Sequence, residues 1–172
     1  MYSIKEIEKD DIYDYMYVNT YAWDEIYKGI MLDEFLIKIK NELEQNVERL
    51  KNEFDQTKIE QSDYKRFLLK EDNEPVGIIG ICKSREEKYP NSGELCSIYL
   101  LNKAKNKGYG RLLFEKAKEE LRKENFNDMI IFCLKDNPTN KFYEYMGGKL
   151  VFSKERNIGG KDLIENVYYY HI

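Results

Sequence analysis

Apolar residues recur along this chain with two spacings, and each spacing predicts one kind of secondary structure. Runs that are continuous or that alternate with polar residues predict strands, whereas apolar residues three or four positions apart predict helices. The longest helical stripe contains seven residues: Leu32, Leu36, Ile39, Leu43, Val47, Leu50 and Phe54. It predicts one helix of about 33 Å with Asp33 as its N-cap. We expect this helix to pack on its own sheet, with a share in a dimer seam as the alternative.

The other segments are short and alternate between the two kinds of structure. The expected strands are Ser3–Glu8, Tyr64–Lys70, Pro75–Lys83, Glu94–Leu101, Met129–Leu134, Lys149–Arg156 and Leu163–Tyr170. The other expected helices are Asp10–Lys28, Gly108–Lys123 and Pro138–Met146. The segment 94–101 is expected to be more buried than the hairpin before it, and 129–134 to be a central strand covered on both faces.

The resulting order, β-α-α-β-β-β-α-β-α-β-β, predicts an α/β fold with α+β character. We expect three layers, α-β-α, around a mixed, mostly antiparallel central sheet. No internal repeat, low-complexity tract or Pro/Gly-rich linker interrupts the chain, so residues 1–172 are expected to form a single domain.

Composition excludes several classes of protein. With 42% hydrophobic and 35% charged residues, the chain is typical of a globular protein. No apolar run approaches ~18 residues, and the first residues lack the apolar core of a signal peptide, so we expect a cytoplasmic protein with no membrane partner. A net charge of -4 does not favour nucleic-acid binding. The segment 103–111 nevertheless holds four cations and no acid, which indicates either a small anionic ligand such as a phosphate or a solvated basic loop.

The cysteines and the single histidine give no sign of a metal site. Cys82, Cys96 and Cys133 are widely spaced, and each lies in an apolar segment, so we expect small core residues rather than zinc ligands or a disulfide framework. His171 lies next to the C-terminus, so a mechanism that needs histidine is not expected.

A glycine-rich loop precedes the third predicted helix. Gly108-Tyr109-Gly110-Arg111 opens that helix, where unpaired backbone N–H groups and the helix dipole favour a pyrophosphate. Glycine lets the backbone approach the phosphates closely. The spacing fits neither the Walker loop nor the dinucleotide fingerprint.

The segment 98–117, IYLLNKAKNKGYGRLLFEKA, resembles the acetyl-CoA segment of the GNAT superfamily of N-acetyltransferases, whose pattern is [QR]-x-x-G-x-[GA] after a strand. Lys105, Gly108 and Gly110 stand at its three defined positions. Lys105 replaces the usual Gln or Arg, and Asn106 stands where glycine is common; lysine supplies charge without a planar fork, so cofactor affinity can differ. With the segment described next, the resemblance implies that twelve residues contact acetyl-CoA: Ile98, Tyr99, Leu100, Lys105, Asn106, Lys107, Gly108, Tyr109, Gly110, Arg111, Asn137 and Tyr143.

A second segment, 137–148, resembles the family pattern N-P-x-x-x-F-Y-E-x-x-G-[GF]. The resemblance implies that Tyr143 protonates the leaving CoA sulfur and that Asn137 lies near the pantetheine arm. A phenol with a pKa of ~10 can give a proton to a thiolate whose conjugate thiol has a pKa of ~8.5. The alternatives are a core aromatic for Tyr143 and a plain helix cap for Asn137.

The reaction implied is direct acetyl transfer to a primary amine within a ternary complex. Removing the ammonium proton costs about 4 kcal/mol at pH 7, and Glu94 is the candidate base, with a partly exposed structural glutamate as the alternative. A backbone N–H at Tyr99 or Leu100 is expected to stabilise the oxyanion. No metal is expected.

Three functions remain open at this stage. Segments 23–30 and 156–165 resemble the polyamine-acetyltransferase-like branch more loosely, and they favour a small-molecule acceptor such as a polyamine. The alternatives are a protein or peptide N-acetyltransferase and a non-catalytic acyl-CoA-binding regulatory protein. A homodimer is possible, since dimers are the commonest soluble oligomers.

Overall fold

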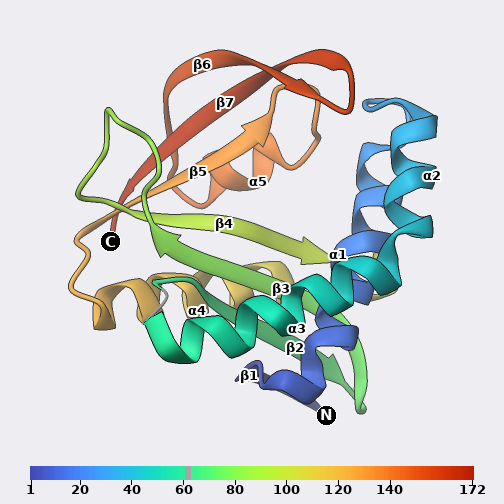
Figure 1. Ribbon diagram of the computed structural model, residues 1–172. Coiled ribbons are helices and arrows are strands. Elements are labelled where there is room, and N and C mark those ends of the chain that lie inside the picture. Colours follow the sequence, from blue (N-terminus) through green and yellow to red (C-terminus); the bar gives the residue numbers. More distant parts are fainter. Residues whose placement is uncertain (61–62) are drawn as a thin grey trace.

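The computed structural model describes residues 1–60 and 63–172 of the chain. Its centre is a seven-stranded sheet with strand order β1-β2-β3-β4-β5-β7-β6 (Figure 1). The strands are β1 (Tyr2–Glu6), β2 (Lys65–Glu71), β3 (Glu74–Lys83), β4 (Gly93–Leu100), β5 (Asp128–Leu134), β6 (Lys149–Ile158) and β7 (Lys161–His171). Every neighbouring pair is antiparallel except β4 and β5, which run parallel.

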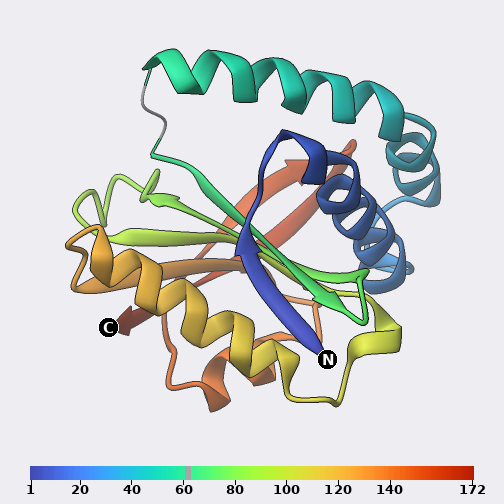
Figure 2. The same cartoon turned by 90° about the horizontal axis from the view of Figure 1, so that it is seen from below.

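Helices cover both faces of the sheet, as the sequence predicts. They are α1 (Ile12–Tyr27), α2 (Asp33–Asn41), α3 (Leu43–Glu60), α4 (Tyr109–Lys123) and α5 (Asn140–Tyr145), with short 3-10 turns at Lys9–Asp11 and Asn102–Ala104. Figure 2 shows α1 and α3 on one face and α4 and α5 on the other. The three-layer prediction is therefore confirmed.

Strand alternation divides the hydrophobic core between the two faces. Leu68 and Ile78 pack with α1 and α3, whereas Leu69, Ile79 and Ile81 pack with α4. Side chains on a strand point alternately to opposite faces, so one strand supplies both clusters.

The single long helix predicted over 32–54 is wrong, because the structure has two helices there. Residue Glu42 interrupts the stripe between α2 and α3. The apolar spacing of three and four residues continues through the break, which is why the sequence concealed it. Asp33 is also not the N-cap: that position is held by Leu32, and Asp33 is the first helical residue.

Two hairpin turns depend on left-handed backbone. Asp72 and Asn73 join β2 to β3 with φ of 50° and 70°, and Gly159 and Gly160 join β6 to β7 with φ of 59° and 86°. Two-residue turns with positive φ match the twist of antiparallel strands, and Asn, Asp and Gly tolerate that conformation best.

The sheet is incomplete between β4 and β5. Pairing there covers only Gly93 with Met129, Glu94 with Ile130 and Leu95 with Ile131, and the two strands then separate. The expectation that β4 is more buried than the preceding hairpin is wrong for the same reason. Residues 96–100 are only half-buried at this opening, while seven successive residues of β3 are buried.

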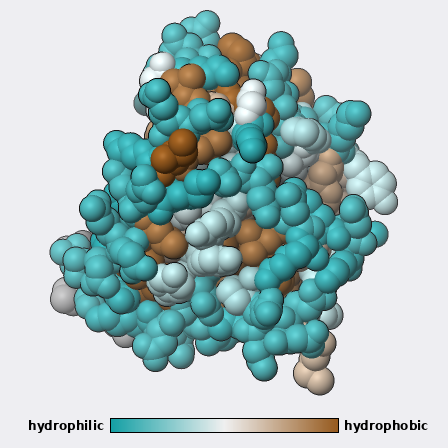
Figure 3. Space-filling model, turned by 90° about the vertical axis from the view of Figure 1, so that its right-hand side faces the viewer, coloured by the Kyte–Doolittle hydropathy of each residue, from teal (hydrophilic) through white to brown (hydrophobic). Residues whose placement is uncertain are grey.

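No helix among the described residues is long and apolar enough to cross a membrane. On the side that carries α1 and α2, hydrophobic side chains lie in separate patches among hydrophilic ones (Figure 3). This view shows no single broad apolar face.

Candidate active site

The opening between β4 and β5 forms a narrow passage through the sheet. It is lined by residues of β4 and β5, by Ile26 and Tyr27 of α1, and by Asn137, Thr139 and Tyr143. We call this space the passage. It shares lining residues with a cleft on the α4 side and with a cavity on the α3 side, so it lies between these two spaces.

The α4-side cleft lies where β4 ends and α4 begins. It has about 1180 Å³ of space open to solvent, lined by Ile26, Ile98, Leu100, Lys105, Asn106, Gly108, Gly110, Arg111, Pro138, Thr139 and Phe142. Its walls combine apolar side chains with the amino end of a fifteen-residue helix. An apolar wall beside the positively polarised amino end of a helix suits a ligand that has an apolar arm at one end and phosphate groups at the other.

The loop before α4 uses left-handed backbone at two positions. Gly108 has φ of +83° and Asn106 has φ of +62°. A Cβ built on Gly108 would meet no atom within 4 Å, and one on Gly110 would lie 3.7 Å from Leu100 and Phe142. The glycines therefore leave room for a ligand at the start of the helix.

Two cations are available at this loop and two are not, since Lys103 is paired with Glu74 at 2.6 Å and Lys107 with Glu71. Among the described residues, Lys105 and Arg111 make no ion pair, and both line the cleft. The side chain of Lys107 instead lies 2.8 Å from Glu71, and Tyr109 donates a hydrogen bond to the same carboxylate at 2.7 Å. That hydrogen bond raises the pKa of Tyr109 to about 12. The side chains of Lys107 and Tyr109 are thus bound to Glu71, and only their backbone groups remain for the predicted contact with the cofactor.

Tyr143 lies in the passage, at the junction of the two faces. Its ring is 5% exposed, and burial raises the pKa of its phenol well above the usual value. The hydroxyls of Tyr27 and Tyr99, which lie 3.4 Å apart, line the same passage. The hydroxyl of Tyr143 is therefore neutral, and it shares the passage with the rings and hydroxyls of two other tyrosines.

Asn137 also lines the passage, but the helix after it begins later than predicted. Its side-chain oxygen accepts a hydrogen bond from the N–H of Thr139 at 2.9 Å, and α5 begins at Asn140. The residue caps a turn that precedes the helix. That contact agrees with a capping role, and Asn137 also belongs to the lining of the passage.

Glu94 is fully buried on the face that carries α1 and α3. Its carboxylate accepts hydrogen bonds from the backbone N–H of Arg85 at 3.0 Å and from the guanidinium of Arg85. The contact raises the pKa of Arg85 above its usual value. Arg85 lines the α3-side cavity and Glu94 does not, although both residues line a smaller space next to it.

The α3-side cavity has about 760 Å³ of space open to solvent between α1, α3 and the sheet. Its polar lining comes from Tyr15, Asn19, Asn46, Arg49, Glu53, Tyr64, Arg66, Arg85 and Ser97. No sequence motif marks any of these residues. They come from five separate segments, and only the fold brings them together.

Cys82 and Cys133 are buried, as expected, but the sequence did not predict that Cys82 and Cys96 are neighbours. Cys133 is buried as a small core residue, but Cys82 and Cys96 lie side by side on neighbouring strands, with their sulfur atoms 2.7 Å apart. Fourteen residues separate them in the chain. The register of β3 against β4 is what brings them together.

Comparison with known proteins agrees with this geometry. The chain matches the model of the acetyltransferase (GNAT) family over residues 21–147. It is 27% identical over 166 residues to YuaI, an uncharacterized N-acetyltransferase of Bacillus subtilis strain 168, and the match covers 96% of this chain and 90% of YuaI.

Two solved structures show the same fold. PaiA N-acetyltransferase from Thermoplasma acidophilum, in complex with coenzyme A, has a TM-score of 0.73 at 20% identity, covering 100% of this chain and 99% of that one. YncA from Salmonella typhimurium, with its cofactor acetyl-CoA, has a TM-score of 0.67 at 14% identity, covering 99% and 93%.

The seven-stranded mixed sheet, open between β4 and β5 beside a glycine-lined cleft, is the fold of an acetyltransferase. The chain belongs to the acetyltransferase (GNAT) family. It is an acetyl-CoA-dependent N-acetyltransferase.

Proposed function

We propose that the enzyme transfers an acetyl group from acetyl-CoA in the α4-side cleft directly to a primary amine in the α3-side cavity. The passage carries this proposal, because it is lined by Tyr143 and lies between the two spaces, with lining residues in common with each. When bound, acetyl-CoA supplies the activated thioester. The chain's own residues supply position, charge and protons.

The α4-side cleft fits acetyl-CoA in shape and chemistry. The N–H groups at the start of α4, with Lys105 and Arg111, suit a pyrophosphate, and the space left by Gly108 and Gly110 permits its close approach. Ile98, Leu100 and Phe142 form an apolar wall for the rest of the molecule.

The exposed edge of β4 offers hydrogen bonds to the ligand. The N–H of Leu101 donates to Val76 of β3 at 3.0 Å. Because N–H groups alternate in direction along a strand, those of Ile98 and Leu100 point the other way, toward β5, where pairing has ended. Of the two donors predicted for the oxyanion, this favours Leu100 over Tyr99.

Tyr143 is proposed to protonate the leaving thiolate. A buried phenol is a weaker acid than a free one, but a thiolate in the same apolar passage is also a stronger base. The two effects oppose each other, so the proton transfer stays feasible.

Glu94 is retained as the proposed base for the acceptor ammonium. Its oxygens are engaged by Arg85, so it accepts a proton only when the side chain of Arg85 moves aside or through a bridging water. Arg85 is mostly exposed, at 68% of its side chain, which allows such a movement.

The charge of the α3-side cavity narrows the class of amine that is proposed as the acceptor. Arg49, Arg66 and Arg85 line it with only one carboxylate, Glu53, and Glu94 lies behind Arg85. Arg66 pairs loosely with Glu53 at 3.7 Å, and Arg49 has no ion pair within the described part of the chain. Three cations against two anions do not suit a polyamine, the acceptor favoured by sequence. They favour an amine that also carries a carboxylate or another anionic group.

The test uses acceptors that differ by one carboxylate. Acetyl-CoA turnover is measured with lysine against cadaverine and with ornithine against putrescine, with spermidine included. We expect kcat/KM at least tenfold higher for the amino acids. Arg49→Gln should reduce that preference, while Arg111→Gln, at the other cleft, should raise KM for acetyl-CoA only. A preference for cadaverine and spermidine in the wild-type enzyme would restore the polyamine proposal.

A protein or peptide acceptor is the second candidate. A protein or peptide acceptor would need an open groove, whereas α1 and α3 cover the α3-side cavity. Turnover with an amine-bearing peptide, and none with small amines, would favour it. Binding of acetyl-CoA without turnover on any acceptor would favour the regulatory alternative. A cytoplasmic location remains part of the proposal.

A further inference from the structure

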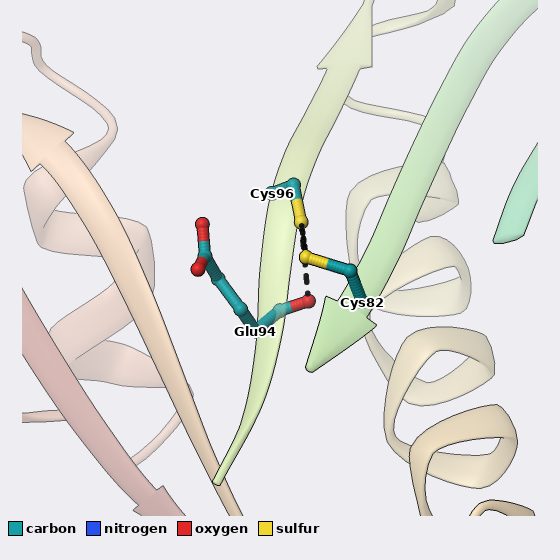
Figure 4. Close-up of side chains that lie close together, drawn as sticks. All are labelled: Cys82, Glu94 and Cys96. Atoms are coloured by element: carbon teal, nitrogen blue, oxygen red, sulfur yellow. Dashed lines mark hydrogen bonds between the residues drawn. The ribbon is translucent and has the colours of Figure 1, made fainter. Parts of the chain in front are cut away.

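The thiols of Cys82 and Cys96 face each other beside the α3-side cavity. Cys82 lies near the end of β3 opposite Glu94, and Cys96 follows two residues later on β4. Their sulfur atoms are 2.7 Å apart, and Figure 4 shows each pointing toward the other. A bonded pair of sulfurs is separated by about 2.05 Å, so a small movement would join them.

A β-bulge aims Cys96 at its partner. The register shifts from Gly80 opposite Ser97 to Ile81 opposite Leu95, which leaves Cys96 as an additional residue on β4. Such a bulge bends the strand and redirects a side chain. Cys96 consequently lines the passage, the α3-side cavity and the space beside Glu94.

Cys82 is the member of this pair that favours the thiolate form, whereas the pKa of Cys96 is raised. The pKa of the Cys82 thiol is lowered, first because its thiolate accepts a hydrogen bond from Cys96, and further because Arg85 is near. Cys133 differs, since burial raises its pKa to about 12. Thiolates, rather than thiols, react with oxidants.

A metal is a poorer occupant of the same place. Ligand atoms of Cys82, Glu94 and Cys96 lie within 4.8 Å of one another. The carboxylate of Glu94, however, turns away from the sulfurs in Figure 4 and is bound to Arg85, whose positive charge repels a cation. Among the described residues this leaves two sulfur ligands, fewer than the four of a structural zinc site.

We propose that Cys82 and Cys96 are a redox modification site that a peroxide converts to a reversible disulfide. One thiolate attacks hydrogen peroxide, forming a sulfenic acid and hydroxide. The second thiol attacks that sulfur and expels its oxygen, and the thiol proton and the hydroxide end in water. The sum is two thiols and one peroxide giving one disulfide and two waters, and an added dithiol reverses it.

The disulfide also lowers acetyl transfer, and this part rests on the proposed function. Bonding to Cys82 pulls the bulge toward β3, beside Ser97 and the passage. We expect kcat/KM to fall at least fivefold on oxidation and to recover with dithiothreitol. Cys82 lines none of the three spaces through which the proposed reaction runs, so Cys82→Ser should keep its activity under peroxide.

The first readout is chemical and does not require an acceptor. The purified protein is treated with graded hydrogen peroxide, alkylated with N-ethylmaleimide in denaturant, and analysed by mass spectrometry. We expect a loss of two mass units, one alkylated thiol, and a peptide pair joining Cys82 to Cys96. Cys133→Ser should form the same link, and Cys82→Ser or Cys82→Ala should not.

Three results would overturn the proposal. One is a protein that keeps all three thiols alkylatable after peroxide. Another is oxidation to sulfinic acids without a cross-link. The third is a purified protein holding about one zinc ion that protects both thiols until a chelator removes it. A cross-link without loss of activity would reject only the regulatory part, and failure to find any acceptor would leave the chemical result standing.

Discussion

The position of Tyr143 is fixed by its backbone as well as by its ring. Its carbonyl accepts a hydrogen bond from the hydroxyl of Tyr170 at 2.7 Å and another from the N–H of Gly148 at 2.9 Å. A Cβ on Gly148 would lie 2.5 Å from the Tyr170 hydroxyl, so the final strand and this glycine together hold the α5 region in place. A proton donor must be held this way to reach one sulfur reproducibly.

Tyr143→Phe should lower kcat by about ten- to a thousandfold, because the phenolic proton is lost while the ring remains. The dissociation constant for acetyl-CoA, measured by calorimetry, should change little. Since burial raises the pKa of Tyr143, the wild-type enzyme should not lose activity through this group below about pH 10. Tyr145→Phe, an exposed neighbour, is the control. Wild-type turnover in Tyr143→Phe would remove its role as acid.

Glu94→Gln should shift the pH–rate profile to higher pH, because the acceptor would then have to lose its proton in solution. The measurement is kcat/KM for the amine from pH 6 to 10. Glu120→Gln removes another buried, paired glutamate on α4 and should leave the profile in place. An unchanged profile in Glu94→Gln would assign Glu94 to positioning Arg85.

At the scale of elements, the sequence predicted each strand and the order of layers, since their spacing and turn residues are local signals. It could not predict the break at Glu42, because the apolar stripe keeps its phase across it.

At the site, the sequence indicated the glycine loop and Tyr143 as candidates through their local motifs. It missed Arg49, Arg66 and Arg85, because a cavity made by two helices and a sheet edge leaves no pattern in any one segment. For the same reason it treated Cys82 and Cys96 as separate.

The amino end of α4 can be tested with Gly108→Ala. Left-handed backbone costs a non-glycine residue about 1–2 kcal/mol, and the added methyl points into open space in the α4-side cleft. We expect the dissociation constant of acetyl-CoA to rise about tenfold. Gly160→Ala is the matched control, since it has φ of +86° and an equally open Cβ but lies in the β6–β7 turn. Both variants should lose similar stability by thermal unfolding. Equal acetyl-CoA affinity in the two would contradict a phosphate site at this helix.

At the scale of the molecule, the two substrates are proposed to approach from opposite faces of one sheet. Neither space blocks the other, because they share lining residues only through the passage. Both ligands can therefore be bound at once, as direct transfer requires.

Initial rates measured over a grid of both substrates should give intersecting lines in double-reciprocal plots. Desulfo-CoA should compete with acetyl-CoA and not with the amine. Parallel lines would instead indicate a covalent acetyl-enzyme, for which Cys96 and Cys133 are the thiols in the lining of the passage. Cys96→Ser and Cys133→Ser would then test that route.

The short contact between β4 and β5 also bears on how the chain folds. Among the residues that the structure describes, it is the only link within the sheet between β1–β4 and β5–β7, and it joins residues 36 positions apart, such as Leu95 and Ile131. Hairpins close short loops, whereas this contact must close a longer one, so we expect it to form late and to open early. Amide hydrogen exchange should be faster at this junction than inside either half, and acetyl-CoA should slow it by contacting β4 and the segment after β5, both of which line the α4-side cleft.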